Sequence, residues 1–161
     1  MTLRLFLAAL ALVACGCSSS FDHAWALSQP GGTIAKDGRP GAPSPIRRSQ
    51  FDGRWSGRWT SDQHRALFSR KPESGAMRLV LAKTAPGKYR ANVRAHWLVF
   101  RSDYEVLLDG EERARVLRLR GVQNVRPIFG GPYRYDAVVM HTGFTMRYDS
   151  RYDRGKVELA R

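Results

Sequence analysis

Hydrophobic and polar residues alternate with a period of two from residue 51 to the end of the chain. In the first run, Phe51, Trp55 and Trp59 share one face, while Arg54 and Arg58 lie on the other. Alternation of this kind is typical of β-strands that bury one side and expose the other. Comparable runs follow at 77–81, 89–99, 104–108, 117–120, 133–139, 144–148 and 156–161.

Short clusters of turn-forming residues separate these runs, at 85–88, 109–111, 130–132, 141–143 and 153–155. Glycine tolerates positive φ and proline fixes φ, so each cluster predicts a tight connection. About eight strands joined in this way predict an all-β antiparallel meander that closes into a small barrel, because closure removes exposed sheet edges. A two-sheet sandwich is the alternative, since the alternation fits both folds. The best helical signal here is a short turn over 62–68, with Asp62 as its cap.

The start of the chain has a different pattern, in which Arg4 precedes an apolar run at 5–14. A membrane span needs roughly twenty apolar residues, so this shorter run predicts a secretory signal peptide. The run ends in Leu12-Val13-Ala14-Cys15, which resembles the lipobox of bacterial lipoproteins. The resemblance implies cleavage after residue 14, acylation of Cys15 and anchoring in a membrane. Because Gly16 follows the cysteine, the resemblance also favours the outer membrane.

A conventional signal peptide is the alternative, with Ala24-Trp25-Ala26 as its cleavage site. That alternative predicts a soluble protein, secreted or periplasmic. The only other cysteine is Cys17, so acylation of Cys15 would leave no disulfide in the chain.

Proline and glycine are dense between the signal and the alternating region, as at 29–32, 37–41 and 43–45. Such a segment buries too little apolar surface to offset the entropy of ordering it. The sequence therefore predicts a signal peptide at 1–14, a lipidated N-terminus with a flexible linker at 15–50, and a β-domain at 51–161.

Basic residues outnumber acidic ones, with 27 Lys plus Arg against 14 Asp plus Glu and a formal charge of +13. This excess favours anionic partners. For a protein of the cell envelope, these would be lipopolysaccharide phosphates and phospholipid headgroups, while nucleic acid is not expected as a partner in vivo.

Two Gly-x-Trp units occupy the first alternating run, Gly53-Arg54-Trp55 and Gly57-Arg58-Trp59. They resemble the first-strand Gly-x-Trp of the lipocalin and calycin barrels. In that family the tryptophan plugs one end of the barrel, and an arginine near the end of the last strand stacks on it. The resemblance implies that Trp55 and Arg161 form this stack. With its signal and linker, the whole chain also resembles uncharacterised exported bacterial proteins.

Motifs for catalysis or metal binding are not found. None of the four histidines, at positions 23, 64, 96 and 141, has a His or Cys at metal-ligand spacing. No Gly-x-Ser-x-Gly elbow, phosphate loop or dinucleotide fingerprint occurs. The sequence therefore predicts a protein that is not an enzyme and uses no cofactor or metal. A hydrolase-like activity of Glu111 and Glu112 is the alternative, and it would need both side chains to face a cleft.

Two functions agree with these patterns. The first is a binding module whose barrel holds a small apolar or amphipathic ligand. The second is a filled, structural barrel whose arginine-rich exterior binds anionic envelope components or a protein partner. In the first, the ligand would be lined by inward-facing aromatic residues, namely Trp55, Trp59, Tyr89, Trp97, Tyr104, Tyr135 and Phe144.

Overall fold

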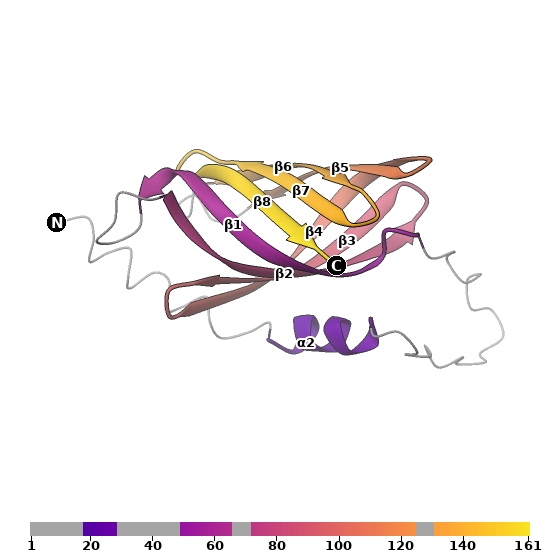
Figure 1. Ribbon diagram of the computed structural model, residues 1–161, viewed down its shortest axis with the longest axis horizontal. Helices are drawn as coiled ribbons and strands as arrows, with labels where there is room; N and C mark the ends of the chain where they lie inside the picture. The colour runs from indigo at the N-terminus through magenta and orange to yellow at the C-terminus, as the bar shows by residue number, and fades with distance from the viewer. Residues whose placement is uncertain (1–17, 29–48, 66–71, 125–130) are drawn as a thin grey trace.

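Eight antiparallel strands form a closed barrel in the computed structural model, which describes residues 18–28, 49–65, 72–124 and 131–161 (Figure 1). Each strand pairs with the next along the chain, and the last pairs with the first. This confirms the predicted meander and barrel over the sandwich. The strands are β1 Gly53–Arg65, β2 Pro72–Ala85, β3 Lys88–Trp97, β4 Phe100–Arg113, β5 Val116–Asn124, β6 Pro132–Val139, β7 Gly143–Asp149 and β8 Arg154–Ala160.

The inward residues of the strands fill the barrel. β8 shows the pattern most simply, since Val157 and Leu159 are buried while Lys156, Glu158 and Ala160 are exposed. Fully burying one large aliphatic or aromatic side chain contributes roughly 1.5–3 kcal/mol, so these alternating positions supply most of the stability. The largest of the almost completely buried side chains are Trp55, Tyr89, Phe51, Phe144, Leu79, Leu81, Leu117 and Leu119.

The seam between β1 and β8 requires glycine on both strands. Gly57 pairs with Leu159, and Gly155 pairs with Ser61. A Cβ atom on Gly57 would overlap the carbonyl oxygen of Glu158, and one on Gly155 would overlap the carbonyl oxygen of Thr60. The backbones therefore approach closely where the barrel closes.

The predicted helical turn over 62–68 is wrong for residues 62–65, which continue β1, while residues 66–68 lie outside the described part of the chain. The pairing of β1 with β2 shifts register between Thr60 and Arg65. Within this stretch, the Ser61 hydroxyl oxygen accepts a hydrogen bond from the Gln63 amide at 3.2 Å. The irregular pattern at Asp62 therefore marks a β-bulge-like irregularity, not a helix.

Part of the predicted flexible linker is a helix, α2 Ser18–Leu27, which contacts the outer side of β2, β3 and β4 (Figure 1). Phe21 is only 2% exposed, and Trp25 stacks on it with ring centroids 5.5 Å apart. The helix therefore contributes two aromatic side chains to a contact with the barrel wall. The conventional cleavage site at 24–26 falls inside this helix. The predicted signal peptide, Cys15 and residues 29–48 of the linker lie outside the described residues.

Within the described ranges, no helix combines the length and the apolar character needed to cross a membrane.

Candidate ligand-binding site

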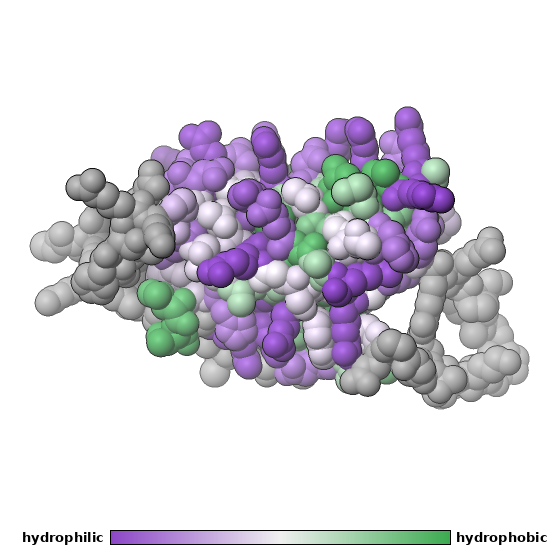
Figure 2. All heavy atoms as spheres, viewed as in Figure 1, coloured by the Kyte–Doolittle hydropathy of each residue, from purple (hydrophilic) through white to green (hydrophobic). Residues whose placement is uncertain are grey.

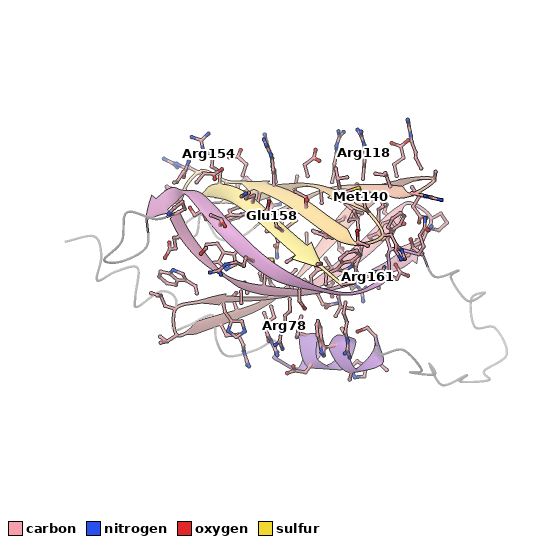
Figure 3. The ribbon with its side chains drawn as sticks, viewed as in Figure 1. Arg78, Arg118, Met140, Arg154, Glu158 and Arg161 are labelled. Atoms are coloured by element: carbon pink, nitrogen blue, oxygen red, sulfur yellow. The ribbon has the colours of Figure 1, made fainter. Side chains whose placement is uncertain are left out.

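One end of the barrel is closed by the side chains of Trp55 and Arg161. The Trp55 indole is completely buried, and its Nε1 donates to the Phe51 carbonyl oxygen at 3.3 Å. The Arg161 guanidinium lies 4.7 Å from the ring centroid of Trp55, and its Nη2 donates to the carbonyl oxygen of Gln50 at 2.7 Å (Figure 3). The structure thus brings together the two side chains that the lipocalin resemblance pairs.

Charged groups surround this closed end. The Asp52 carboxylate accepts hydrogen bonds from the backbone amides of Ser49 and Lys83, at 3.0 and 2.9 Å. Burial raises the pKa of Asp52, and this outweighs the opposite effect of the two amides. The Lys83 ammonium pairs with Glu112 at 2.7 Å, and Glu112 accepts a hydrogen bond from the Tyr89 hydroxyl. Glu111 pairs instead with Arg113, at 2.7 Å, on the exposed surface. Both carboxylates of the hydrolase alternative are thus engaged in ion pairs.

The opposite end of the barrel holds a cavity of about 180 Å³. The cavity lies between the strand ends that are farthest from Trp55. We call this the open end of the barrel. Three of its lining side chains, Met77, Met146 and Val157, are buried and apolar. The described residues that line the cavity are Trp59, Met77, Ala95, Tyr104, Tyr133, Tyr135, Met146, Tyr148, Asp153 and Val157.

Aromatic rings make up much of this lining. Tyr133 lies between two other tyrosines, with its ring centroid 6.4 Å from that of Tyr135 and 6.4 Å from that of Tyr148. The Tyr133 and Tyr135 rings are stacked, with an interplanar angle of 21°, whereas the Tyr133 and Tyr148 rings are tilted by 31°. The Trp59 indole is fixed by a hydrogen bond from its Nε1 to the His96 carbonyl oxygen at 3.0 Å. The rings therefore form an ordered wall.

Some polar groups of the cavity lining form hydrogen bonds within the protein. Asp153 accepts hydrogen bonds from the Ser61 hydroxyl at 2.6 Å and from the Tyr148 hydroxyl at 3.2 Å. The Tyr135 hydroxyl donates to the Gln123 side-chain oxygen at 3.3 Å. The hydroxyls of Tyr104 and Tyr133 have no hydrogen-bond partner within the described ranges. They are available to a ligand.

Burial raises the pKa of the tyrosine hydroxyls around the cavity. The shift is upward for Tyr104, Tyr135 and Tyr148, and in each case the largest cause is removal of the side chain from water. All three hydroxyls are therefore protonated and neutral at physiological pH. They can donate hydrogen bonds and present uncharged aromatic faces.

The cavity is small for a ligand-binding barrel. Sites for drug-sized molecules measure about 300–1,000 Å³, whereas a cavity of about 150 Å³ holds benzene. The interior therefore accommodates one compact group, and the rest of the barrel is filled by its own side chains.

The predicted lining residues divide between the two ends. Trp59, Tyr104 and Tyr135 line the cavity. Trp55, Tyr89 and Phe144 belong to the packed core, and Trp97 donates a hydrogen bond from its indole to Glu73 near the end of β3. These four do not line the cavity.

Several lining residues were not predicted. Tyr133 lies on the inward face of β6 and Tyr148 on that of β7. Both occupy inward positions of the period-two pattern, so the sequence could have identified them. Asp153 lies in a turn that the sequence predicts only as a connection, and no pattern there indicates that its side chain reaches the cavity.

Two features of the exterior are also candidates for binding. Exposed basic residues gather on the outer side of β5–β8, where Figure 3 shows Arg118 and Arg154 pointing away from the barrel. On this face Arg120 pairs with Asp136 at 3.3 Å, whereas Arg118, Arg134 and Arg147 have no ion pair with any described residue. We call residues Arg118, Arg120, Arg134, Arg147, Arg154 and Lys156 the basic face.

The second exterior feature is the apolar tip of the β3–β4 hairpin. Leu98 is 66% exposed and Val99 is 90% exposed. Figure 2 shows hydrophobic residues at this end of the molecule. The tip follows closely on Ala95, which lines the cavity, so the apolar turn and the cavity lie at the same end of the barrel.

The histidines at positions 96 and 141 are exposed, and no group of three His, Cys, Asp or Glu residues in the described part of the chain could hold a metal ion. No protein-family model, curated protein or solved structure matches this chain. The candidate site is therefore interpreted from its own residues.

Proposed function

We propose that this protein is an exported, lipid-anchored binding protein that holds a small apolar or amphipathic group at the open end of its barrel, without catalysing a reaction. The observation that carries the binding proposal is the cavity of about 180 Å³ walled by aromatic and thioether side chains. Its two unpartnered hydroxyls, on Tyr104 and Tyr133, suit the polar end of an amphipathic ligand.

The anchoring part of the proposal rests on the tetrapeptide that ends at Cys15. Two or more acyl chains anchor a protein firmly, whereas a single chain binds a membrane only marginally. Helix α2, which packs on the barrel, begins at Ser18, soon after Cys15. An acylated Cys15 would therefore hold the helix and the barrel close to the lipid surface. The outer membrane is the proposed location, and a soluble periplasmic or secreted protein is the alternative.

The test is native mass spectrometry of the full protein purified from the membranes of its own host. We expect a mass increment for two or three acyl chains at Cys15, together with a retained small molecule. A Cys15→Ser variant should lose the increment. A soluble protein with no increment would contradict the anchor.

Filling the cavity tests the binding part separately. Ala95 lines the cavity, so Ala95→Leu should occupy it and abolish ligand retention. Ala76 is exposed on the neighbouring strand, and Ala76→Leu serves as the matched control. Equal retention by both variants would place the ligand elsewhere.

A second candidate function is supported by the basic face. Three of its arginines have no acidic partner within the described ranges, and arginine grips phosphate in a bidentate manner. Binding of the non-acylated Cys15→Ser protein to vesicles containing phosphatidylglycerol is the test. Arg134→Gln with Arg147→Gln should weaken binding about tenfold or more. Arg90→Gln with Arg113→Gln removes the same charge from arginines that pair with Glu105 and Glu111, and should weaken it less.

A further inference from the structure

Five aromatic side chains line the open-end cavity, namely Trp59, Tyr104, Tyr133, Tyr135 and Tyr148. The face of an aromatic ring carries partial negative charge and attracts a cation that lies within about 6 Å of the ring centroid. Tryptophan attracts most strongly, and the attraction grows when the cation is removed from water. A cavity walled in this way suits a positively charged group that has apolar substituents.

The charges of the residues around the cavity also favour a positively charged ligand. The chain has 27 Lys plus Arg, yet none of the described residues that line the cavity is a Lys or Arg. Among the described lining residues, the one charged side chain is the carboxylate of Asp153, which accepts hydrogen bonds from Ser61 and Tyr148. Although the protein is strongly basic, the described lining residues therefore favour a cation.

The rings are held before any ligand arrives. Trp59 is fixed by the His96 carbonyl oxygen, Tyr135 by Gln123 and Tyr148 by Asp153. The Trp59 indole also packs over Gly75, where a Cβ atom would lie 2.6 Å from its Nε1. Because these side chains are already ordered, binding loses little conformational entropy.

We propose that the cavity selects an alkylammonium group, such as the trimethylammonium of choline. This inference rests on the proposed binding function of the cavity and names the ligand class for it. The volume of about 180 Å³ admits a compact cationic head and excludes a whole lipid. The ligand is therefore a small ammonium compound or the headgroup of a lipid, and both offer the same group to the rings.

The first experiment compares choline with its neutral isostere, in which carbon replaces the nitrogen. Binding to the full chain is measured by isothermal titration calorimetry. We expect choline to bind at least about tenfold more tightly than the isostere. Equal affinities would overturn the cation inference and leave the proposed binding function standing. Binding of neither compound, nor of any retained molecule, would overturn both.

A pair of variants tests the role of the rings. The Tyr104 hydroxyl has no partner in the described part of the chain, so Tyr104→Phe keeps the ring and breaks no hydrogen bond. We expect Tyr104→Leu to lose about fivefold or more in choline affinity, and Tyr104→Phe, which keeps the ring, to lose clearly less. Full choline affinity in Tyr104→Leu would contradict the inference. Tyr133→Leu repeats the test if the first leucine variant does not fold, which circular dichroism reveals.

Binding to phosphatidylcholine vesicles shows whether the ammonium group belongs to a lipid or to a soluble compound. The Cys15→Ser protein is used, because it cannot bind vesicles through the proposed acyl chains. Vesicle binding that free choline competes away assigns the site to a lipid headgroup. Binding of free choline without vesicle binding assigns it to a soluble compound. Both outcomes support the ligand class.

Discussion

Arg94 of β3 contacts both the neighbouring strand β4 and the helix α2. Its guanidinium forms two hydrogen bonds with the Asp103 carboxylate, at 2.8 and 2.7 Å, and one with Asp22 of α2 at 2.8 Å. It also lies 4.3 Å from the ring centroid of Phe21. Arg94 is only 9% exposed, so its charge is stabilised by these partners and not by water.

Replacing Arg94 should therefore be costly. Arg94→Met leaves the buried carboxylate of Asp103 without its main partner, and removing one member of a buried ion pair costs about 3–5 kcal/mol. Urea denaturation measures the loss in free energy of unfolding. Arg90→Met is the control, because Arg90 pairs with Glu105 on the exposed surface at 3.5 Å and such pairs contribute about 0–1 kcal/mol. Similar losses in both variants would contradict a special role for Arg94.

The same contact makes helix docking sensitive to acid. The hydrogen bond from Arg94, assisted by its positive charge, lowers the pKa of Asp22 below the ordinary value of 3.8. The docked state thus gains stability that is complete above pH 3.8 and is lost as the pH falls through the lowered pKa. Acid titration of tryptophan fluorescence should show a transition below pH 3.8, because Trp25 leaves the barrel. The Asp22→Asn protein should lack this transition, and its persistence there would assign it to another group.

At the scale of elements, the strands were predictable and the helix was not. Period-two alternation depends only on which side of a strand is buried, so the eight runs identify the eight strands. The segment Ser18–Leu27 contains neither proline nor glycine, but it adjoins a proline-rich stretch, and the composition of the whole linker is typical of a flexible segment. Its helix is also stabilised by contacts with Arg54, Arg78 and Arg94, which no local pattern contains.

Two hairpin turns use residues that are unfavourable for them. Leu98 has φ 52° and Ala114 has φ 47°, in the left-handed region that glycine and asparagine adopt more easily. For an ordinary residue this conformation costs roughly 1–2 kcal/mol. A leucine that is both strained and exposed at the open end is a feature that stability alone does not explain.

Relieving this strain should stabilise the barrel. Leu98→Asn tolerates the positive φ and loses no packing, so we expect the free energy of unfolding to rise by about 1 kcal/mol. Thermal denaturation measures the change. Leu107 is 63% exposed within β4 and its φ is not in the left-handed region, so Leu107→Asn should give no gain. Equal effects of the two substitutions would mean that replacing an exposed apolar side chain with a polar one, and not relief of strain, causes the gain.

At the scale of the whole molecule, the barrel has one filled end and one end with a cavity. Alternation predicts that Trp55 and Trp59 both face inward, and both do. It does not predict how far along the barrel axis each lies, because that position depends on the tilt and stagger of the strands. For this reason the sequence places Trp55, Tyr89 and Phe144 around a ligand, whereas they pack in the core.

The β1–β8 seam should be sensitive to added side-chain volume. Gly57→Ala forces a side chain against the backbone of β8, and overpacking of this kind costs about 1–3 kcal/mol. The same change at Gly143 meets nothing within 4 Å and has no positive φ, so Gly143→Ala should be neutral or stabilising by about 0.4–1 kcal/mol. Chemical denaturation of both proteins measures the difference. A stable Gly57→Ala protein would mean that the seam can open to admit a methyl group.

That seam also sets the order in which the molecule can form. Every other pairing joins neighbouring hairpin strands, which meet within microseconds. The pairing of Gly57 with Leu159 instead joins the first strand to the last, so β1 and β8 cannot pair until both strands are available. Contacts between residues so distant in sequence form slowly. Until β8 pairs with β1, the folding chain therefore carries two open sheet edges, and these are the edges at which it can aggregate.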